Sequence, residues 1–214
     1  MQTMLIMFLH LIKASSVTIC YSVFIIAIAT ALGTILAIVN FSGSKPIKLI
    51  ILVFIFMIRG IPILVHLFIS FYVFPLLGLK LPAVLIALFG LSIVISAYIS
   101  EVIRGAIESI PRGQTDAYKG IGMTYWLGMR KVILPQAFRY ALPPLISWWV
   151  NSVKATSLVS VLALRELTLA GKEMATYSLK PLPVFAMVLL IYFAITFPLA
   201  RWGESLERKY TYLH

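Results

Sequence analysis

Charged side chains interrupt several of the apolar stretches of this chain. Arg59 and Glu101 each lie within or at the end of an apolar run, and Lys154 stands close to the hydroxyls of Thr156 and Ser157. Charge is costly in lipid, so such groups usually face a cavity or a partner. A carboxylate can bind a solute's ammonium group, and a lysine beside hydroxyls suits a carboxylate. These residues are therefore candidates for a pathway through the membrane.

The same charges also have a purely structural interpretation. Glu101 precedes Arg104 by three residues, a spacing that allows an ion pair on one helix face. Lys154 can equally anchor a break in a polar helix. Both interpretations stay open from the residues alone.

A predicted helix break in one apolar stretch gives Arg59 a structural role as the alternative. Gly60 and Pro62 kink or end a helix at mid-depth, and the carbonyls that they free need a partner. We expect the Arg59 guanidinium to satisfy those carbonyls. His66 is alone on an apolar face, which favours a packed histidine over a proton relay.

Composition places the chain in the membrane class. Of its 214 residues, 61% are hydrophobic and 12% are charged, and the mean hydropathy is +1.01. A soluble domain is about half apolar. The net charge of +11 is concentrated in the polar links, where it signals membrane topology, so no nucleic-acid partner is expected.

Signatures of enzymes, metal sites and nucleotide sites are missing from the sequence. It contains no H-E-x-x-H, no paired intramembrane Asp, no serine–histidine arrangement and no G-x-x-x-x-G-K-[ST] loop. Cys20 is the only cysteine, which excludes a disulfide framework. We predict no catalytic residue, cofactor or metal, and any ATP must be bound by a separate protein.

The pattern predicts an all-α, polytopic membrane protein with one domain over residues 1–214. Each crossing needs roughly 20 apolar residues. No strong internal repeat is visible, and five crossings are few for a complete pathway, so the chain is expected to form half of a dimer. The five predicted transmembrane helices cover residues 16–39, 47–74, 83–103, 145–164 and 184–199.

The polar loop at residues 104–142 is far longer than a turn requires. Pro111 leads into a new helix start, and Asp116 is expected in the first turn, at the positive end of the helix dipole. Gly122 is expected to stop this helix or to allow a close approach, and Leu134-Pro135 to end the segment. The helix either fits a partner's groove or simply caps the bundle.

Lysine and arginine counts predict the orientation. Positive charge favours the cytosol, so the side that holds the long loop is inside, which places the N-terminus outside and the C-terminus inside. Two basic residues, Arg59 and Lys154, lie within spans. The outside set is Lys13, Lys80, Arg165, Lys172 and Lys180. The inside set is Lys45, Lys48, Arg104, Arg112, Lys119, Arg130, Lys131, Arg139, Arg201, Arg208 and Lys209.

Asp116-Ala117-Tyr118, Gly122 and Val132-Ile-Leu134-Pro135 follow one another in the polar loop at fixed spacings. Their order resembles the EAA loop (E-A-A, three residues, G, nine residues, I-x-L-P) of binding-protein-dependent ABC permeases, and the flanking motifs resemble the polar amino acid subfamily of these permeases. Further motifs that match are Arg59-Gly-Ile-Pro62 (R-G-T-P), Ala97-Tyr98-Ile-Ser-Glu101-Val-Ile-Arg104-Gly105 (A-Y-x-x-E-x-x-R-G), Pro111-Arg-Gly-Gln114 (P-K-G-Q), Leu134-Pro-Gln-Ala137 with Leu142-Pro-Pro144 (L-P-Q-A, then L-P-P), and Lys154-Ala-Thr-Ser-Leu158 (K-D-T-S-L).

This resemblance implies a multi-pass transport subunit of a bacterial inner membrane. Its implied partners are cytosolic ATP-binding subunits, a second permease chain, an extracytoplasmic amino-acid-binding protein that meets residues 165–183 and 75–82, and membrane lipid. The coupling residues it implies are Asp116, Ala117, Tyr118, Gly122, Leu134 and Pro135. The pathway residues it implies are Arg59, Tyr98, Glu101, Lys154, Thr156 and Ser157.

Four departures from the family pattern carry information. Val94 stands where the family often has Asn, and Ala155 replaces the acidic residue of K-D-T-S-L. Losing both polar groups suggests a less polar or less cationic solute, or the non-binding half of a heterodimer. Asp116 replaces Glu, and Tyr118 replaces the second Ala, which suggests a partner cleft shaped for a larger side chain.

An ion channel or proton-coupled carrier subunit, with Glu101 and Lys154 as a relay, remains the main alternative. A membrane-embedded enzyme is a weaker one. Neither the identity of the amino acid nor the choice between homodimer and heterodimer follows from the sequence.

Overall fold

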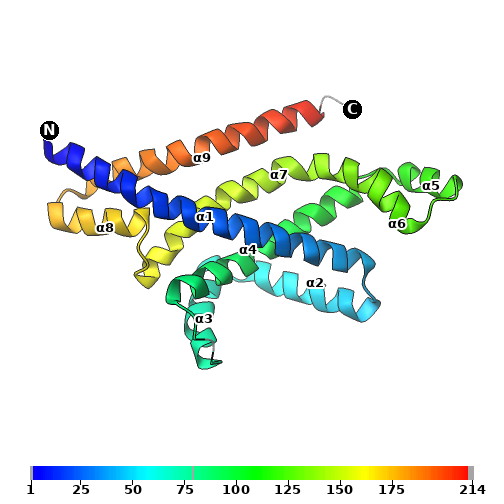
Figure 1. Cartoon of the computed structure of the whole chain (residues 1–214), viewed down its shortest axis with the longest axis horizontal. Helices are drawn as coiled ribbons and strands as arrows, with labels where there is room; N and C mark the ends of the chain where they lie inside the picture. Colours follow the sequence, from blue (N-terminus) through cyan, green and yellow to red (C-terminus); the bar gives the residue numbers. More distant parts are fainter. Residues whose placement is uncertain (1, 79, 212–214) are drawn as a thin grey trace.

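The computed structural model describes residues 2–78 and 80–211, and every regular element in these ranges is helical. Figure 1 shows long helices lying roughly side by side, with short helices at the two ends. The elements are α1 (Gln2–Ser42), α2 (Lys45–Gly60), α3 (Ile63–Leu76), α4 (Ala83–Glu108), α5 (Arg112–Gly120), α6 (Tyr125–Gly128), the π-helical turn η1 (Met129–Ile133), α7 (Leu134–Ala155), the 3₁₀ helix η2 (Thr156–Leu162), α8 (Leu167–Ser178) and α9 (Pro181–Thr211).

The central pair of the bundle is α1 and α4. Gly33 of α1 allows the two backbones to approach, because a Cβ at that position would lie 2.7 Å from Ile99 Cγ2 and 2.8 Å from the Ser96 carbonyl oxygen. The main core follows from this contact, with Ile25, Leu91 and Ile99 fully or almost fully buried in it. α7 joins the pair through a 3.1 Å hydrogen bond from Trp149 Nε1 to Thr30 Oγ1.

α1 is longer than the predicted span at 16–39. Its 41 residues correspond to about 60 Å of helix, twice the roughly 30 Å hydrocarbon core of a bilayer. The additional N-terminal turns are stabilised by a second core, in which Leu11 packs with Leu167 of α8 and Val184 of α9. Sequence reasoning missed these turns because their partners lie more than 150 residues away.

The second predicted span is broken, as the Gly60–Pro62 motif indicated. α2 and α3 meet at an angle of 108°. Ile61 is extended (φ −114°, ψ 139°), which is the conformation favoured before proline. α3 therefore leaves the direction of α2 instead of continuing it (Figure 1).

No helix starts after Pro143 and Pro144, where the fourth predicted span was expected to begin. α7 begins at Leu134, runs through both prolines and ends at Ala155, where the chain tightens into η2. α6, η1 and α7 follow one another without a gap, so Leu134-Pro135 starts a long helix instead of ending the loop. A proline removes only its own backbone bond, and a helix packed on its neighbours tolerates that loss. The segment between α4 and α7 is accordingly shorter than predicted, residues 109–133.

Composition supports fewer crossings than the five predicted. In the described ranges, α1, α4 and α9 are long and apolar enough to span a membrane, and the bent pair α2–α3 adds a fourth. α7 does not qualify by composition, although it packs on α4, α9 and α1. The link predicted at 165–183 contains α8, and the last predicted span and its tail form one continuous helix, α9.

Among the shorter helices, α8 lies at one end of the molecule and α5 and α6 lie at the other, whereas α3 projects from the side (Figure 1). In Figure 1 the N-terminal turns of α1 lie beside α8 at one end, while α5, α6 and the C-terminal turns of α9 lie towards the other. The start of α2 is also at the α5 end. This arrangement separates the loop at 109–133 from the α8 region by the length of the bundle.

Candidate functional site

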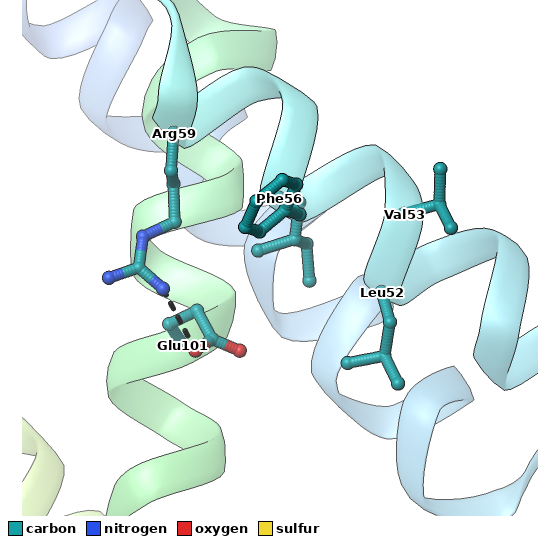
Figure 2. Close-up of a pocket in the computed structure, with 6 residues that line it drawn as sticks. Leu52, Val53, Phe56, Arg59 and Glu101 are labelled. Carbon is teal, nitrogen blue, oxygen red and sulfur yellow. Dashed lines mark hydrogen bonds and ion pairs between the residues drawn. The ribbon is translucent and has the colours of Figure 1, made fainter.

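An ion pair joins the broken end of α2 to α4. Arg59 Nη1 lies 3.0 Å from Glu101 Oε2. Figure 2 shows Arg59 reaching from α2 towards Glu101 on α4, with Phe56, Val53 and Leu52 along the same wall. These residues line a cleft of about 370 Å³. The Arg59 side chain is 46% exposed and the Glu101 side chain is 19% exposed, so the pair lies at the mouth of this cleft.

Glu101 is shared between two arginines. Arg104 Nε donates to Glu101 Oε1 at 2.8 Å and Arg104 Nη2 to Oε2 at 3.1 Å, so the i, i+3 pair, one of the two interpretations that the sequence left open, is present. Arg104 also bonds Glu108 one turn further on. Both carboxylate oxygens of Glu101 therefore already accept charge-assisted hydrogen bonds.

Tyr98 connects this ion pair to α7. Its ring stacks on Trp148, with 4.2 Å between ring centroids and 27° between planes. The guanidinium carbon of Arg59 lies 5.7 Å from the Tyr98 centroid, within reach of a cation–π contact. α2, α4 and α7 thus meet around Arg59, Glu101, Tyr98 and Trp148.

His66, and not Arg59, satisfies the carbonyl freed by the break. The Ile58 carbonyl would bond the backbone N–H four residues on, but Pro62 has none. His66 Nε2 lies 3.0 Å from that oxygen, so its ring N–H is the donor. His66 is buried, as expected for a packed histidine. The expected role of Arg59 in bonding freed carbonyls is corrected, because its side chain turns to the nearer opposite charge of Glu101.

The polar residues at the end of α7 are divided between surface and core. Lys154 is exposed, and its ammonium has no hydrogen-bond or ion-pair partner in the described ranges. Ser157 is half-buried and donates to the Lys154 carbonyl at 2.7 Å. Thr156 is fully buried and donates to the Val153 carbonyl at 2.7 Å, so its hydroxyl faces the core. The departures Val94 and Ala155 are buried too, at 2% and 9% exposure.

α5 is a short polar helix at the end opposite α8. Pro111 precedes it and Arg112 is its first residue. Asp116 is therefore the fifth residue, and the first turn carries no acidic side chain, which corrects the expected dipole contact. The helix starts earlier than expected because a proline just before the first turn favours initiation there. Asp116 and Ala117 are exposed and available to a partner.

Gly122 stops α5, as one of the two sequence interpretations expected. Its φ is +77°. The Met123 N–H donates to the Tyr118 carbonyl at 3.0 Å and the Gly122 N–H to the Lys119 carbonyl at 2.9 Å, which is the Schellman pattern. A Cβ at this position would meet open space, so glycine serves the left-handed backbone and not a close approach.

Tyr118 faces the protein interior. Its side chain is 3% exposed and packs with Ile110, Met129, Ile133 and Ala137. The idea that Tyr118 signals a larger partner cleft is corrected, because the extra volume is accommodated within this chain. Leu134 and Pro135, in contrast, are exposed at the start of α7.

Sequence reasoning missed a buried carboxylate at the other end. Glu166 is fully buried and caps α8, accepting the Leu169 N–H at 2.9 Å. It also receives the hydroxyl of Tyr192 at 2.8 Å and that of Thr18 at 3.4 Å. One carboxylate thereby joins α1, α8 and α9. The available signal was an acidic residue directly before an apolar helix start.

Comparison with known families supplies the identification. Residues 29–212 match the family described as "Binding-protein-dependent transport system inner membrane component". The chain belongs to this family. It is accordingly an inner-membrane transport component, and members of its family are permeases that work with ATP-binding subunits and substrate-binding proteins.

Named relatives of this permease match it over most of both chains. The probable amino-acid ABC transporter permease YckA of Bacillus subtilis is 34% identical over 205 residues, covering 96% of this chain and 91% of the relative. The L-cystine transport system permease TcyB of the same organism is 37% identical over 179 residues, covering 83% and 76%. The glutamine transport system permease GlnP of Escherichia coli is 33% identical over 201 residues, covering 93% and 92%.

Solved structures agree with this fold. A chain of an amino acid ABC transporter crystallised with histidines superposes with a TM-score of 0.90 at 29% identity, covering 97% of both chains. The MetNI methionine ABC transporter in an inward-facing conformation gives a TM-score of 0.65 at 17% identity, covering 92% of this permease and 93% of that chain, which shows the shared fold alone.

Proposed function

We propose that this permease is the membrane-spanning subunit of an ATP-driven importer for polar amino acids. The observation that carries the proposal is an exposed, capped helix, α5, at one end of a bundle that closely resembles an amino acid ABC transporter. The relatives named for amino-acid, cystine and glutamine transport support the substrate class.

The proposed contact with the ATPase subunits is the exposed surface of α5. Asp116 and Ala117 face solvent, and Gly122 sets the direction in which the chain leaves the helix. Leu134 and Pro135 are exposed beside it, at the start of α7. ATP-driven closure of two ATPase subunits would move α5 and, through α7, the helices that surround the pathway.

The proposed pathway lies along α4 and the end of α7. Both carboxylate oxygens of Glu101 accept hydrogen bonds from arginines. We therefore assign Glu101 and Arg59 to a link between α4 and α2, and not to a binding site for a solute's ammonium group. Lys154 retains a free ammonium beside Ser157 and is the preferred contact for a solute carboxylate. Thr156 stabilises the end of α7 from the core through its bond to the Val153 carbonyl. Tyr98 lies beside the Arg59–Glu101 pair.

A second permease chain is proposed to complete the pathway. α7 packs along α4 and α9 and is proposed as the fifth crossing despite its lower hydropathy. Five crossings and an exposed lysine in the last turn of α7 favour a partner opposite Lys154. Such a partner, identical or related, would exclude lipid from that charge.

The proposed orientation places the N-terminus and α8 outside and α5 and the C-terminus in the cytosol. Eleven of the loop lysines and arginines fall on the α5 side and five on the α8 side by the predicted topology, and Figure 1 separates the two regions. The extracytoplasmic binding protein is then proposed to meet the α8 region and residues 75–78 and 80–82. The orientation can be tested by replacing Cys20 and placing single cysteines at Lys119 of α5 and Tyr177 of α8. A membrane-impermeant maleimide added to intact cells should then label the cysteine at position 177 and not the one at position 119.

Purification with the proteins encoded nearby tests the main proposal. The expected result is co-purification with an ATPase, and uptake into vesicles that requires ATP and a binding protein. The solutes supplied would be radiolabelled L-amino acids together with L-cystine. Uphill uptake by the permease alone, driven by membrane potential, would replace the proposal with the carrier alternative.

A further inference from the structure

Tyr118 and residue 128 compete for the same space. The Tyr118 ring lies directly against Gly128, which is buried at the end of α6. A Cβ at position 128 would overlap the ring carbons Cδ2 and Cε2 and would lie 2.6 Å from Cγ. Rotation of the ring about the Cβ–Cγ bond leaves Cγ in place and does not relieve the overlap. In this packing arrangement, the Tyr118 ring leaves room only for glycine at position 128.

Apart from the covalent chain at its two ends, α5 is attached to the rest of the molecule mainly through this contact. Tyr118 is the only buried residue of α5. Among the described residues, the other side-chain hydrogen bond from α5 is an exposed 3.4 Å contact between Gln136 Nε2 and Gln114 Oε1, and an exposed hydrogen bond of this length adds little stability. The Tyr118 ring is therefore the principal packing contact between α5 and the bundle.

The ring rests on the beginning of the long α7 helix. Gly128 is followed by the π-helical turn at Met129–Ile133. The first and last residues of this turn, Met129 and Ile133, pack in the same cluster as Tyr118. Turns of this kind are often found at functional sites. α7 continues from the turn to Trp148, which stacks on Tyr98 near Arg59.

We infer that the sizes of residues 118 and 128 form a complementary pair that transmits movement of α5 to α7. Tyr118 acts as a positioning residue: it touches neither solute nor ATPase, and it holds the docking helix against the π turn. This inference rests on the proposed function of α5.

Four versions of the complete transporter test the pair: the natural chain, Gly128→Ala, Tyr118→Ala and the double variant. Gly128→Ala is expected to lower uptake of the radiolabelled amino-acid mixture about tenfold when residue 118 is tyrosine. The same change is expected to alter uptake less than about twofold when residue 118 is alanine, since the overlap is gone. The alanine background is the matched control.

The informative readout is solute taken up per ATP hydrolysed, normalised to the amount of assembled complex. Gly128→Ala is expected to keep its ATPase subunits and to hydrolyse ATP while moving less solute. If the Gly128→Ala protein is not found in the membrane, the test rests on Tyr118→Ala alone. That variant is expected to lower the amount of solute taken up per ATP hydrolysed in an assembled complex. An unchanged ratio in that variant, or an equal loss from Gly128→Ala in both backgrounds, overturns the inference.

Ala117→Arg on the exposed face separates this inference from the proposed function. It is expected to release the ATPase subunits, because it places bulk and charge at the docking surface. Normal association of Ala117→Arg would refute docking through α5. A different outcome would refute only the size pair. In that case Ala117→Arg loses its ATPase subunits, which supports docking through α5, but Gly128→Ala has equal effects in the tyrosine and alanine backgrounds.

Discussion

The Tyr192 hydroxyl donates a 2.8 Å hydrogen bond to Oε2 of the fully buried Glu166. The same hydroxyl lies 2.9 Å from Thr168 Oγ1. Because Glu166 also caps α8 and contacts Thr18 of α1, this bond helps to hold three helices at the end that is proposed to face outside. A buried carboxylate that has no cationic partner among the described residues depends on such donors.

Removing that hydroxyl should destabilise the α8 end. Tyr192→Phe leaves the carboxylate with one donor fewer and should lower the free energy of unfolding by about 1.5–3 kcal/mol. Thermal unfolding of the purified permease in detergent measures the change. Tyr177→Phe is the matched control, since Tyr177 is 88% exposed, and should change stability by less than about 0.5 kcal/mol. Equal effects of the two variants would contradict the role given to the buried bond.

The Arg59–Glu101 pair should show energetic coupling between α2 and α4. A double-mutant cycle with Arg59→Met and Glu101→Gln should give a coupling energy of about 0.5–3 kcal/mol. The exposed pair Arg201–Glu204, three residues apart on α9, provides the comparison and should give no more than about 0.2–1 kcal/mol. A coupling near zero for Arg59 and Glu101 would mean that the two helices are held without this link.

Gly122 should be sensitive to substitution through its backbone. Gly122→Ala forces a side chain into the left-handed region at a cost of about 1–2 kcal/mol, whereas Gly122→Asn should cost less because Asn tolerates that region. Gly122→Leu should abolish ATP-driven uptake while membrane insertion remains intact. Gly105→Ala, at a helical glycine where an added Cβ would meet open space, should leave uptake unchanged. Survival of uptake in Gly122→Leu would remove Gly122 from coupling.

Lys154 should matter through its charge. Lys154→Met is expected to reduce uptake of radiolabelled amino acids about tenfold or more, because a charged hydrogen bond to the solute carboxylate is lost. Lys154→Arg should retain part of the activity, and the solute concentration for half-maximal uptake should rise in both. Lys45→Met, at an exposed lysine in the first polar turn, should transport normally. Full uptake by Lys154→Met would exclude this lysine from the pathway.

Local signals predicted local features well. Pro62 lacks a backbone N–H and restricts the residue before it, so the break between α2 and α3 could be placed from three residues. Gly122 could be identified as a helix stop for a similar reason, because few other residues adopt a positive φ. The Glu101–Arg104 pair needed only the helical repeat.

Features that depend on distant partners were missed. The first turns of α1 form a helix against Leu167 and Val184, which no local window contains. The helix through Pro143 and Pro144 persists because neighbouring helices pack along it, so two strong helix breakers gave a misleading boundary.

The sequence by itself determined the membrane class, the family and the position of the polar segment that is proposed to dock the ATPase subunits, because composition and short motifs are properties of consecutive residues. Only the tertiary structure decided which way individual side chains face. Tyr118 turns inwards because Gly128, ten residues later, leaves it room, and Arg59 turns to Glu101 because α4 brings a carboxylate within 3.0 Å. Facing and pairing follow from packing between helices, and packing is not encoded within any single segment.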